Sequence, residues 1–300
     1  MLRIAYSPIY KFILPPGHRF PMEKYELLPE QLLYEGTVTP SHFFDPTPLT
    51  PADILLTHTP DYWNRLVRLE LTRKEIRRIG FPLSDILVRR GTHIAGGTLQ
   101  CAYYAMQFGV ALNIAGGTHH AFADRGEGFC LLNDIAIAAN ILLRNGTVER
   151  ILVVDLDVHQ GNGTARLFQN DPRVFTFSMH GAKNYPLKKE TSDLDIPLPD
   201  GTEDNHYLSI LRETLPFLID SVEPDLIFYL SGVDILDSDK LGRLAVSLEG
   251  CRERDRFVFE MCRTNDIPVA VSMGGGYSPQ LPRIIEAHAN TFRLAQEVFF

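Results

Sequence analysis

Residues 153–164 read VVDLDVHQGNGT, and this stretch decides how the rest of the chain is interpreted. Its branched apolar start is typical of a buried strand, but the run ends in Asp155, Asp157 and His159. Alternate residues of an extended strand point to the same side, so we expect these three side chains to share one face. Buried carboxylates without partners cost on the order of several kcal/mol. The stretch therefore predicts a bound cation, with a metal ion as the first candidate.

The composition is that of a globular protein with a large core. Of the 300 residues, 45% are hydrophobic and 22% are charged, and we expect one domain over residues 1–300 because α/β proteins of this length often fold as a unit. The formal net charge of −8 gives no general attraction to phosphates, so no direct nucleic-acid binding is expected. The basic stretches KEIRR (74–78) and Arg89-Arg90 are interpreted as solvated helix faces.

The four cysteines indicate a reducing compartment. They contain no CxxC spacing, so neither a disulfide framework nor a thiolate zinc site is predicted. Cys130 is interpreted as a small packed residue rather than a nucleophile, because no partnered base is evident. The amino-terminal residues lack the pattern of a signal peptide, and no run approaches the roughly 20 apolar residues of a membrane span. We expect a cytoplasmic protein whose oligomeric state the sequence leaves open.

Short apolar runs rich in β-branched residues alternate with stretches of helical spacing. The predicted strands are 2–6, 110–115, 150–157, 174–178, 226–231 and 267–273. The predicted helices are 131–146, 205–222, 247–264 and 282–299. This alternation predicts an α/β fold with a mainly parallel sheet covered on both faces. Residues 8–50, rich in proline and aromatic residues, are expected to form long loops and short helices near the surface.

Polar side chains gather where five of the predicted strands end. These ends read NIAGGTHH, VVDLDVH, TFSMH, FYLSGVD and VSMGGGY. Because the carboxyl ends of parallel strands lie along one edge, where ligands bind, we expect these side chains to converge. Asp157, His159 and Asp234 supply two carboxylates and an imidazole, a set that suits Zn²⁺ or Fe²⁺ with coordination left open. The alternative is a cluster of hydrogen bonds and helix caps without a metal.

Two glycine-rich turns present further polar groups at this edge. A Gly-Gly pair precedes His119 and His120, and a run of three glycines precedes Tyr277. Asp155, beside the candidate ligands, is placed to orient one imidazole and to favour its charged form. A phenol directed at a metal can donate a hydrogen bond to an oxyanion. The residues thus indicate a functional site at this edge of the sheet.

The motifs GGTHHA, GFCLLND, DLDVHQGNGT, SGVD and GGGY, in this order, resemble those of the histone deacetylase family within the arginase/deacetylase superfamily. The resemblance runs over essentially the whole chain and includes the bacterial deacetylase-like and acetoin-utilisation proteins. It implies a single-domain three-layer α/β/α fold with a mainly parallel sheet of about eight strands. It also implies a zinc-dependent hydrolase that removes acyl groups from the lysine side chains of a protein or peptide substrate.

The resemblance assigns roles to the polar residues at the sheet edge. The implied zinc ligands, for which Fe²⁺ is an alternative metal, are Asp157, His159 and Asp234. The implied catalytic residues are the tandem histidines His119 and His120, the transition-state tyrosine Tyr277, Asp155 bonded to the first histidine, and Asn162 facing the second. The implied ligands of a structural potassium ion, through side-chain or backbone oxygens, are Asp155, Asp157, His159, Ser178 and Met179.

The resemblance further implies a narrow channel for the acyl-lysine side chain. Its predicted lining residues are Gly128, Phe129, Tyr185, Leu241 and Gly275. Leu241 stands seven residues after Asp234, where polyamine-selective relatives carry an acidic residue. An apolar residue at this position argues against a polyamine substrate.

One motif departs from that of many members of the family. Where those proteins have HHGDG this chain has HQGNG, so Asn162 replaces a carboxylate that partners the second histidine. The HQGNG stretch looks most like the class IV branch, which raises the possibility of longer acyl groups. An amide orients His120 without lending a full negative charge, so we expect this imidazole to stay neutral to higher acidity than in relatives with aspartate.

Three alternatives remain open. The first is a deacetylase of a small-molecule amide such as an acetylpolyamine. The second is an arginase-like ureohydrolase with two manganese ions, which needs additional bridging ligands. The third is a non-catalytic module that binds acyl-lysine. The motifs favour the lysine deacylase over all three.

Overall fold

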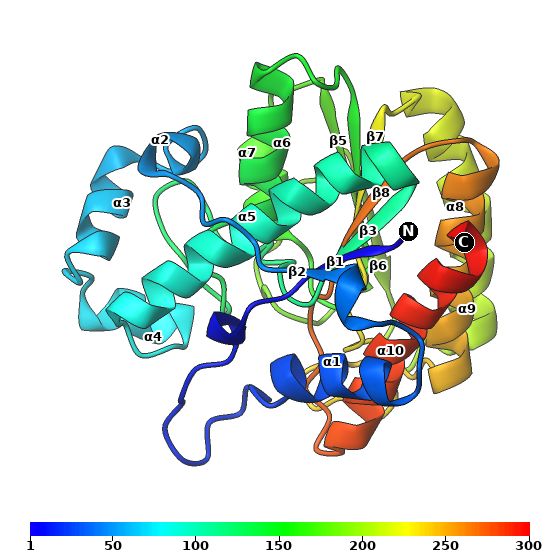
Figure 1. The fold of residues 1–300 in the computed structure, drawn as a ribbon, viewed down its shortest axis with the longest axis horizontal. Coiled ribbons are helices and arrows are strands. Elements are labelled where there is room, and N and C mark those ends of the chain that lie inside the picture. The colour runs from blue at the N-terminus through cyan, green and yellow to red at the C-terminus, as the bar shows by residue number, and fades with distance from the viewer.

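A parallel sheet of eight strands forms the centre of the molecule (Figure 1). The computed structural model describes residues 1–300. The strands are β1 (Arg3–Ala5), β2 (Phe43–Phe44), β3 (Val110–Asn113), β4 (Ile151–Asp155), β5 (Val174–Gly181), β6 (Leu194–Leu198), β7 (Leu226–Leu230) and β8 (Val269–Ser272). Their order is β2-β1-β3-β8-β7-β4-β5-β6, and every neighbouring pair is parallel. The predicted α/β fold with a parallel sheet of about eight strands is confirmed.

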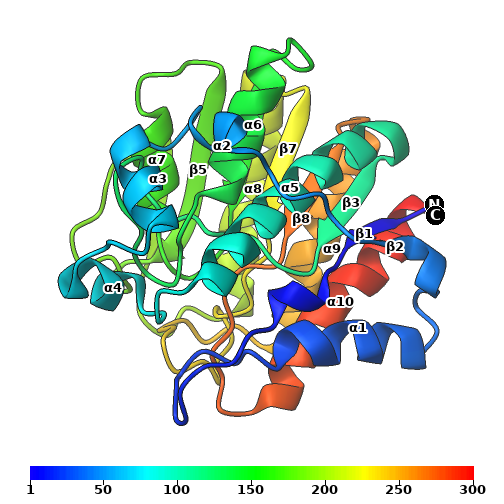
Figure 2. The same cartoon turned by 60° about the vertical axis from the view of Figure 1, so that its left-hand side comes forward.

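Helices cover both faces of the sheet (Figure 2). They are α1 (Lys24–Tyr34), α2 (Pro51–Ile54), α3 (Pro60–Val67), α4 (Arg73–Ile79), α5 (Asp85–Phe108), α6 (Asp134–Arg144), α7 (Asn162–Phe168), α8 (Asp204–Val222), α9 (Leu248–Thr264) and α10 (Leu281–Phe299), with short 3₁₀ helices at Pro8–Tyr10 and Pro40–His42. Helices α5, α6 and α7 lie on one face and α8, α9 and α10 on the other, where α1 packs against α10. No helix combines the length and apolar composition that crossing a bilayer requires.

Successive residues of the central strands face opposite helical layers. In β4, Leu152 and Val154 pack in the cluster that includes residues of α8, α9 and α10, whereas Ile151 and Val153 pack with residues of α6 and α7. Strands buried on both sides read as continuous apolar runs. This is why six of the eight strands were predictable, whereas the four predicted helices followed from the helical spacing of their apolar residues.

The structure adds a 24-residue helix, α5, that the spacing of apolar residues did not predict. Its sequence contains Gly96 and Gly97, which lower helix propensity. A Cβ atom on Gly96 would lie 2.0 Å from the carbonyl oxygen of Thr47, and one on Gly97 would lie 2.6 Å from the hydroxyl of Tyr10. The glycines therefore let other segments approach the helix closely. The missed edge strand β6, LDIPL, contains a proline and is only partly buried, which obscures its pattern.

Residues 8–50 form loops and short helices as expected, but part of this segment is buried and does not lie at the surface. Tyr10, Phe20 and Tyr25 are buried, and α1 is a helix of 11 residues. Arg90 is also buried rather than solvated, because its Nε donates to the carbonyl of Tyr10 at 2.7 Å and its guanidinium lies 4.9 Å from the centre of the Tyr25 ring. Paired polar and cation–π contacts stabilise a cation away from water.

One buried arginine of α9 connects the helical layer to the loops at the sheet edge. Arg254 has no exposed surface. Its Nε donates to Asp255 at 2.9 Å, and its terminal nitrogens donate to the carbonyls of Leu156, Ser231 and Gly232. These carbonyls flank the residues that follow β4 and β7. The guanidinium therefore holds two of the loops that carry the candidate site.

We expect Arg254→Leu to lower the free energy of unfolding by about 3–5 kcal/mol, because it leaves Asp255 buried without its cation. The matched control is Arg252→Leu on the same helix, where an exposed arginine pairs with Glu249 and a change of about 0.5 kcal/mol or less is expected. Urea unfolding followed by circular dichroism measures both. Equal losses in the two variants would contradict the anchoring role of Arg254.

Candidate active site

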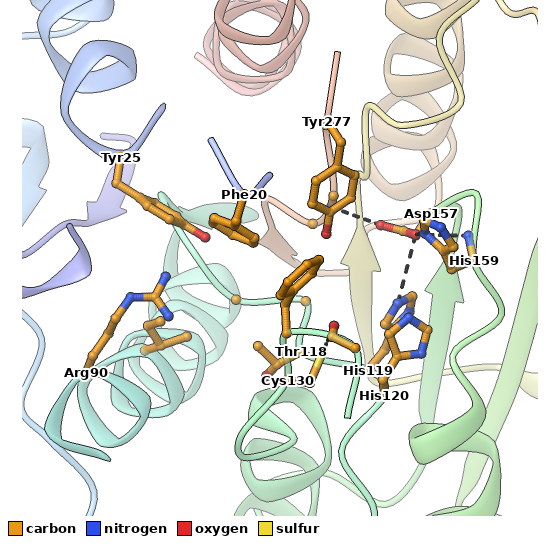
Figure 3. Close-up of a pocket in the computed structure, with 17 residues that line it drawn as sticks. Phe20, Tyr25, Arg90, Thr118, His119, His120, Cys130, Asp157, His159 and Tyr277 are labelled. Carbon is orange, nitrogen blue, oxygen red and sulfur yellow. Dashed lines mark hydrogen bonds and ion pairs between the residues drawn. The ribbon is translucent and has the colours of Figure 1, made fainter. Parts of the chain in front are cut away.

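The carboxyl ends of four neighbouring strands carry the predicted polar residues. Strands β3, β8, β7 and β4 are adjacent in the sheet, and the loops after them hold the imidazole pair, the tyrosine, the second aspartate and the DxDxH stretch. Figure 3 shows Asp157, His159, Tyr277 and the tandem histidines His119 and His120 around one end of a cavity. The structure thus brings together side chains that are separated by more than half of the chain.

Asp157, His159 and Asp234 form a buried cluster. One ligand atom from each side chain lies within 4.8 Å of the others. Nδ1 of His159 is 2.9 Å from Oδ1 of Asp157 and 3.2 Å from Oδ2 of Asp234. Backbone N–H groups hold the outer oxygens: Gly275 donates to Oδ2 of Asp157 and Val158 to Oδ1 of Asp234, each at 2.9 Å. The remaining oxygens and the imidazole nitrogen therefore face a common point.

This cluster needs a positive charge at its centre. Oδ2 of Asp234 is buried without a hydrogen-bond donor, because Nδ1 of His159 can carry one hydrogen and directs it at Asp157. Burial and the Asp157 carboxylate both raise the pKa of Asp234. Burial lowers the pKa of His159, but the two neighbouring carboxylates outweigh this and raise it to about 10. Two carboxylates and one imidazole around an unpartnered oxygen fit a divalent zinc or iron ion.

The chain leaves strand geometry earlier than expected. Strand β4 ends at Asp155, so the expected alternation through His159 is wrong. Instead, the N–H of Asp157 donates to Oδ1 of Asp155 at 3.2 Å, and the N–H of His159 donates to Oδ1 of Asp157 at 2.9 Å. Aspartate side chains that accept from the residue two positions later stabilise turns. These turns, and not the pleat of a strand, direct the two later side chains toward the cluster.

His119 is paired with a carboxylate. Its Nδ1 lies 2.6 Å from Oδ2 of Asp155, and both side chains are buried. Burial lowers the pKa of His119, but the charge of Asp155 and this hydrogen bond outweigh burial and raise the pKa to about 8. The contact expected between Asp155 and the first histidine is therefore present, and it favours an imidazolium at this position.

His120 is paired with an amide. Its Nδ1 lies 2.7 Å from Oδ1 of Asn162, at the start of α7. Burial lowers the pKa of His120 well below its usual range, and the neighbouring imidazoles of His119 and His159 add to the effect. This direction agrees with the expected neutral imidazole. The carboxylate beside His119 thus favours its charged form, whereas His120, beside an amide, stays neutral.

A carboxylate of α6 holds the turn that carries both histidines. Oδ1 of Asp134 accepts from the N–H of Thr118 at 2.7 Å, and its Oδ2 accepts from the N–H of Gly117 at 3.1 Å. Gly116 has φ +87°, and a Cβ there would lie 2.5 Å from Oδ2 of the same carboxylate. The glycine pair therefore permits the close approach that fixes the turn. Asp134 ends the GFCLLND motif but was not among the predicted site residues.

Tyr277 lines the cavity beside the cluster (Figure 3). Its ring meets that of His159 edge-on, with centroids 6.3 Å apart. Burial raises the pKa of the Tyr277 phenol well above its usual range, and the carboxylates of Asp157 and Asp234 raise it further. The hydroxyl therefore keeps its hydrogen near neutral pH and can donate it. Its backbone N–H donates to Asp239 at 2.6 Å, which fixes the loop.

Four of the five predicted channel residues line an outer cavity that leads to the cluster. Its lining includes Gly128, Phe129, Tyr185 and Leu241. The ring of Tyr185 packs edge-on against His120 at 4.9 Å. The fifth, Gly275, lies deeper and lines the inner cavity. Cys130 also lines the inner cavity, where burial raises the pKa of its thiol well above the usual range. This direction agrees with the interpretation of Cys130 as a packed residue and not a nucleophile.

Two cationic side chains, Arg90 and Lys24, lie at or near the inner end of the cavity and were not predicted as site residues. Arg90 and Tyr25 line this end (Figure 3). Nearby, Nζ of Lys24 donates to the carbonyl of Gly274 at 3.2 Å. Burial lowers the pKa of Lys24 to about 8, against the raising effect of the Asp234 and Asp157 charges. No periodicity marks residues 8–34, so only the fold reveals that this segment closes the cavity.

The residues predicted to bind potassium are also close in the fold. Asp155 and Ser178 are register partners across β4 and β5, and the Ser178 hydroxyl lies 3.0 Å from Nδ1 of His180. Met179 continues β5 as a buried residue. Potassium binding itself stays a prediction.

Comparisons with known proteins agree on one family. A family model described as histone deacetylase domain matches residues 18–292. An uncharacterised protein of Picosynechococcus sp. is 45% identical over 99% of each chain. Histone deacetylase 2 of Arabidopsis thaliana is 31% identical over 89% of this chain and 72% of its own. The crystal structure of an HDAC homolog from Aquifex aeolicus has a TM-score of 0.83 at 26% identity, covering 98% of this chain and 84% of the other. The class IV resemblance stays a prediction.

We expect Gly275→Ala to weaken zinc binding about 10–100-fold, the usual effect of disturbing groups that orient metal ligands. The new Cβ would lie 2.0 Å from Oδ2 of Asp234 and 2.7 Å from Oδ2 of Asp157. Gly91→Ala on α5 is the control, because its Cβ would make ordinary contacts no closer than 3.5 Å. Zinc titration against a competing chelator measures both. An unchanged zinc affinity in Gly275→Ala would contradict a metal at this cluster.

Proposed function

The chain belongs to the histone deacetylase family, and on this basis we propose that it is a zinc-dependent amidohydrolase that removes acetyl or longer acyl groups from lysine side chains of proteins. One observation carries the proposal: the buried Asp157–His159–Asp234 cluster shares a cavity with two differently partnered imidazoles and a protonated phenol. A zinc ion in that cluster would supply Lewis-acid chemistry, which acidifies water and polarises an acyl carbonyl. We propose that residues 1–300 act as one catalytic domain.

The protein's own residues divide the remaining chemistry. His120, neutral and free at Nε2, accepts a proton from the attacking water and returns it to the leaving amine. His119, held by Asp155, adds positive charge beside it. The hydroxyl of Tyr277 donates a hydrogen bond to the acyl carbonyl oxygen as negative charge develops on it. Because both imidazoles and Asp155 are buried and Tyr277 is partly buried, these interactions act in a medium of low effective dielectric constant.

The shape of the outer cavity supports an acyl-lysine substrate. Phe129, Tyr185 and Leu241 supply apolar surface to a lining that also includes Arg19 and Arg78, and this apolar surface suits the methylene chain of a lysine side chain. An acyl group that buries further methylenes gains about 0.8 kcal/mol for each. No carboxylate lines this cavity, so it offers no direct partner for the second ammonium of a polyamine.

The proposal also includes a structural potassium ion and a cytoplasmic location. The potassium site would use the oxygens of Asp155, Asp157, His159, Ser178 and Met179, as the family resemblance implies. The location is supported by four free, buried cysteines, since thiols stay reduced in the cytosol.

We expect the protein to release acyl groups from acetyl-, octanoyl- or myristoyl-lysine peptides faster than from acetylpolyamines. Chelation should abolish this activity and zinc should restore it, because no protein group replaces the Lewis acid. Mass spectrometry of the products measures release across the panel. Preferential hydrolysis of acetylpolyamines would favour the small-molecule alternative, and binding without hydrolysis would favour the non-catalytic module.

We expect Tyr277→Phe to keep its zinc and to lose about 10²–10³ in turnover, the usual effect of removing one oxyanion donor. Tyr103→Phe, at an exposed position of α5, is the control that retains activity. Metal content by elemental analysis and initial rates at saturating substrate separate the two effects. Full turnover in Tyr277→Phe would remove this tyrosine from the mechanism.

A further inference from the structure

A buried carboxylate outside the expected catalytic set lies directly behind His120. Glu127 is 8% exposed, and its Oε1 accepts from Nδ2 of Asn162 at 2.8 Å and from the hydroxyl of Tyr185 at 3.0 Å. Its Oε2 lies 3.6 Å from Nε of Arg125. The carboxylate thus touches the partner of His120 and one wall of the outer cavity at the same time.

The contact between Glu127 and Asn162 fixes which way the amide faces. A carboxylate only accepts hydrogen bonds, so the NH₂ group of Asn162 must point at Glu127. The amide oxygen then points at Nδ1 of His120, 2.7 Å away. Since that oxygen only accepts, Nδ1 carries the hydrogen and Nε2 is left with its lone pair. Reversal of the amide would instead place NH₂ against Nδ1 and favour the other tautomer.

The loop that carries Glu127 is itself held in place. The N–H of Gly128 donates to the carbonyl of Arg78 at 3.0 Å, and the N–H of Cys130 donates to the carbonyl of Glu127 at 2.9 Å. A Cβ on Gly128 would lie 2.5 Å from Cδ2 of His120, so the backbone passes close against the imidazole. The carboxylate is therefore presented by a fixed loop and not by a mobile one.

We propose that Glu127 is a positioning residue that acts through Asn162 to hold His120 in the tautomer with a free Nε2. This inference rests on the proposed function, because it assigns that nitrogen the role of proton acceptor. Glu127 also places a full negative charge against the amide of Asn162, on the side away from His120. Relatives with HHGDG carry a negative charge on the residue that corresponds to Asn162. This chain carries a negative charge on Glu127 instead, one side chain further from His120.

The sharpest test is an exchange of the acid and the amide. Asn162→Asp alone would set two carboxylates against each other, so we expect kcat/KM to fall about 10–100-fold, the usual range for groups that orient a catalytic residue's partner. In the Glu127→Gln background, the new amide at position 127 can donate to the new carboxylate at position 162. The double variant should therefore regain activity near that of wild type. An Asn162→Asp loss of equal size in both backgrounds would overturn the proposal.

Two single variants separate positioning from general damage. Glu127→Met removes the acceptor and should lower kcat/KM by a similar factor, whereas Glu127→Gln keeps an acceptor oxygen and should retain most activity. Glu149→Met removes an exposed carboxylate before the opposite end of β4, and serves as the matched control. Thermal unfolding confirms that each variant is folded. Wild-type activity in Glu127→Met would also overturn the proposal.

A readout independent of catalysis distinguishes this inference from the proposed function. In protein with ¹⁵N-labelled histidine, long-range ¹⁵N–¹H spectra should show His120 with its hydrogen on Nδ1, and Glu127→Met should show a mixture of tautomers. The His120 signals are assigned by their loss in His120→Asn. A hydrogen on Nε2 in the wild-type protein would overturn the role of Glu127 even if the protein is an active deacylase. If no substrate of the panel is hydrolysed, the function fails and this spectrum still decides the inference.

Discussion

Two carboxylates and an imidazole are buried together at the sheet edge, and they can remain there only if positive charge lies among them. Much of the surrounding structure serves this requirement. Gly275 and Val158 direct N–H groups at the outer oxygens, and Gly232 passes so close that a Cβ would lie 2.5 Å from Oδ2 of Asp157. Arg254 donates to the carbonyls of Leu156 and Gly232 in the same loops. Backbone dipoles and a buried guanidinium thus fix the ligands in advance, which lowers the cost of ordering them around an ion.

The two adjacent imidazoles show how neighbouring residues acquire different chemistry. They share burial and lie with ring centroids 4.1 Å apart, yet one faces a carboxylate and the other an amide. The negative charge of Asp155 raises the pKa of His119, and the absence of such a charge beside His120 leaves desolvation in control. One ring can therefore carry charge while the other accepts a proton. The difference lies in the partner side chains and not in the histidines themselves.

The amino-terminal segment gives the cavity its inner boundary. Phe20 and Tyr25 stack at 6.1 Å, and the ammonium of Lys24 lies 5.8 Å from the centre of the Tyr277 ring. The same ammonium donates to the carbonyl of Gly274. This segment therefore supports the glycine-rich turn that presents the tyrosine, although it is far from that turn in sequence. Loops with few apolar repeats can carry such roles because their side chains, and not their backbone pattern, make the contacts.

The sequence by itself determined the α/β class, the central parallel strands and the set of polar residues at their carboxyl ends. Continuous apolar runs identify strands buried on both faces, and parallel strands bring their ends to one edge. Motif resemblance added the expected partners of His119 and His120. Only the tertiary structure decided that β4 ends at Asp155, that Tyr10 and Phe20 before α1 are buried, and that Glu127 stands behind Asn162. Those features depend on contacts between distant segments, such as the approach of the Tyr10 hydroxyl to Gly97 of α5. Local pattern carries no information about which distant atoms will meet.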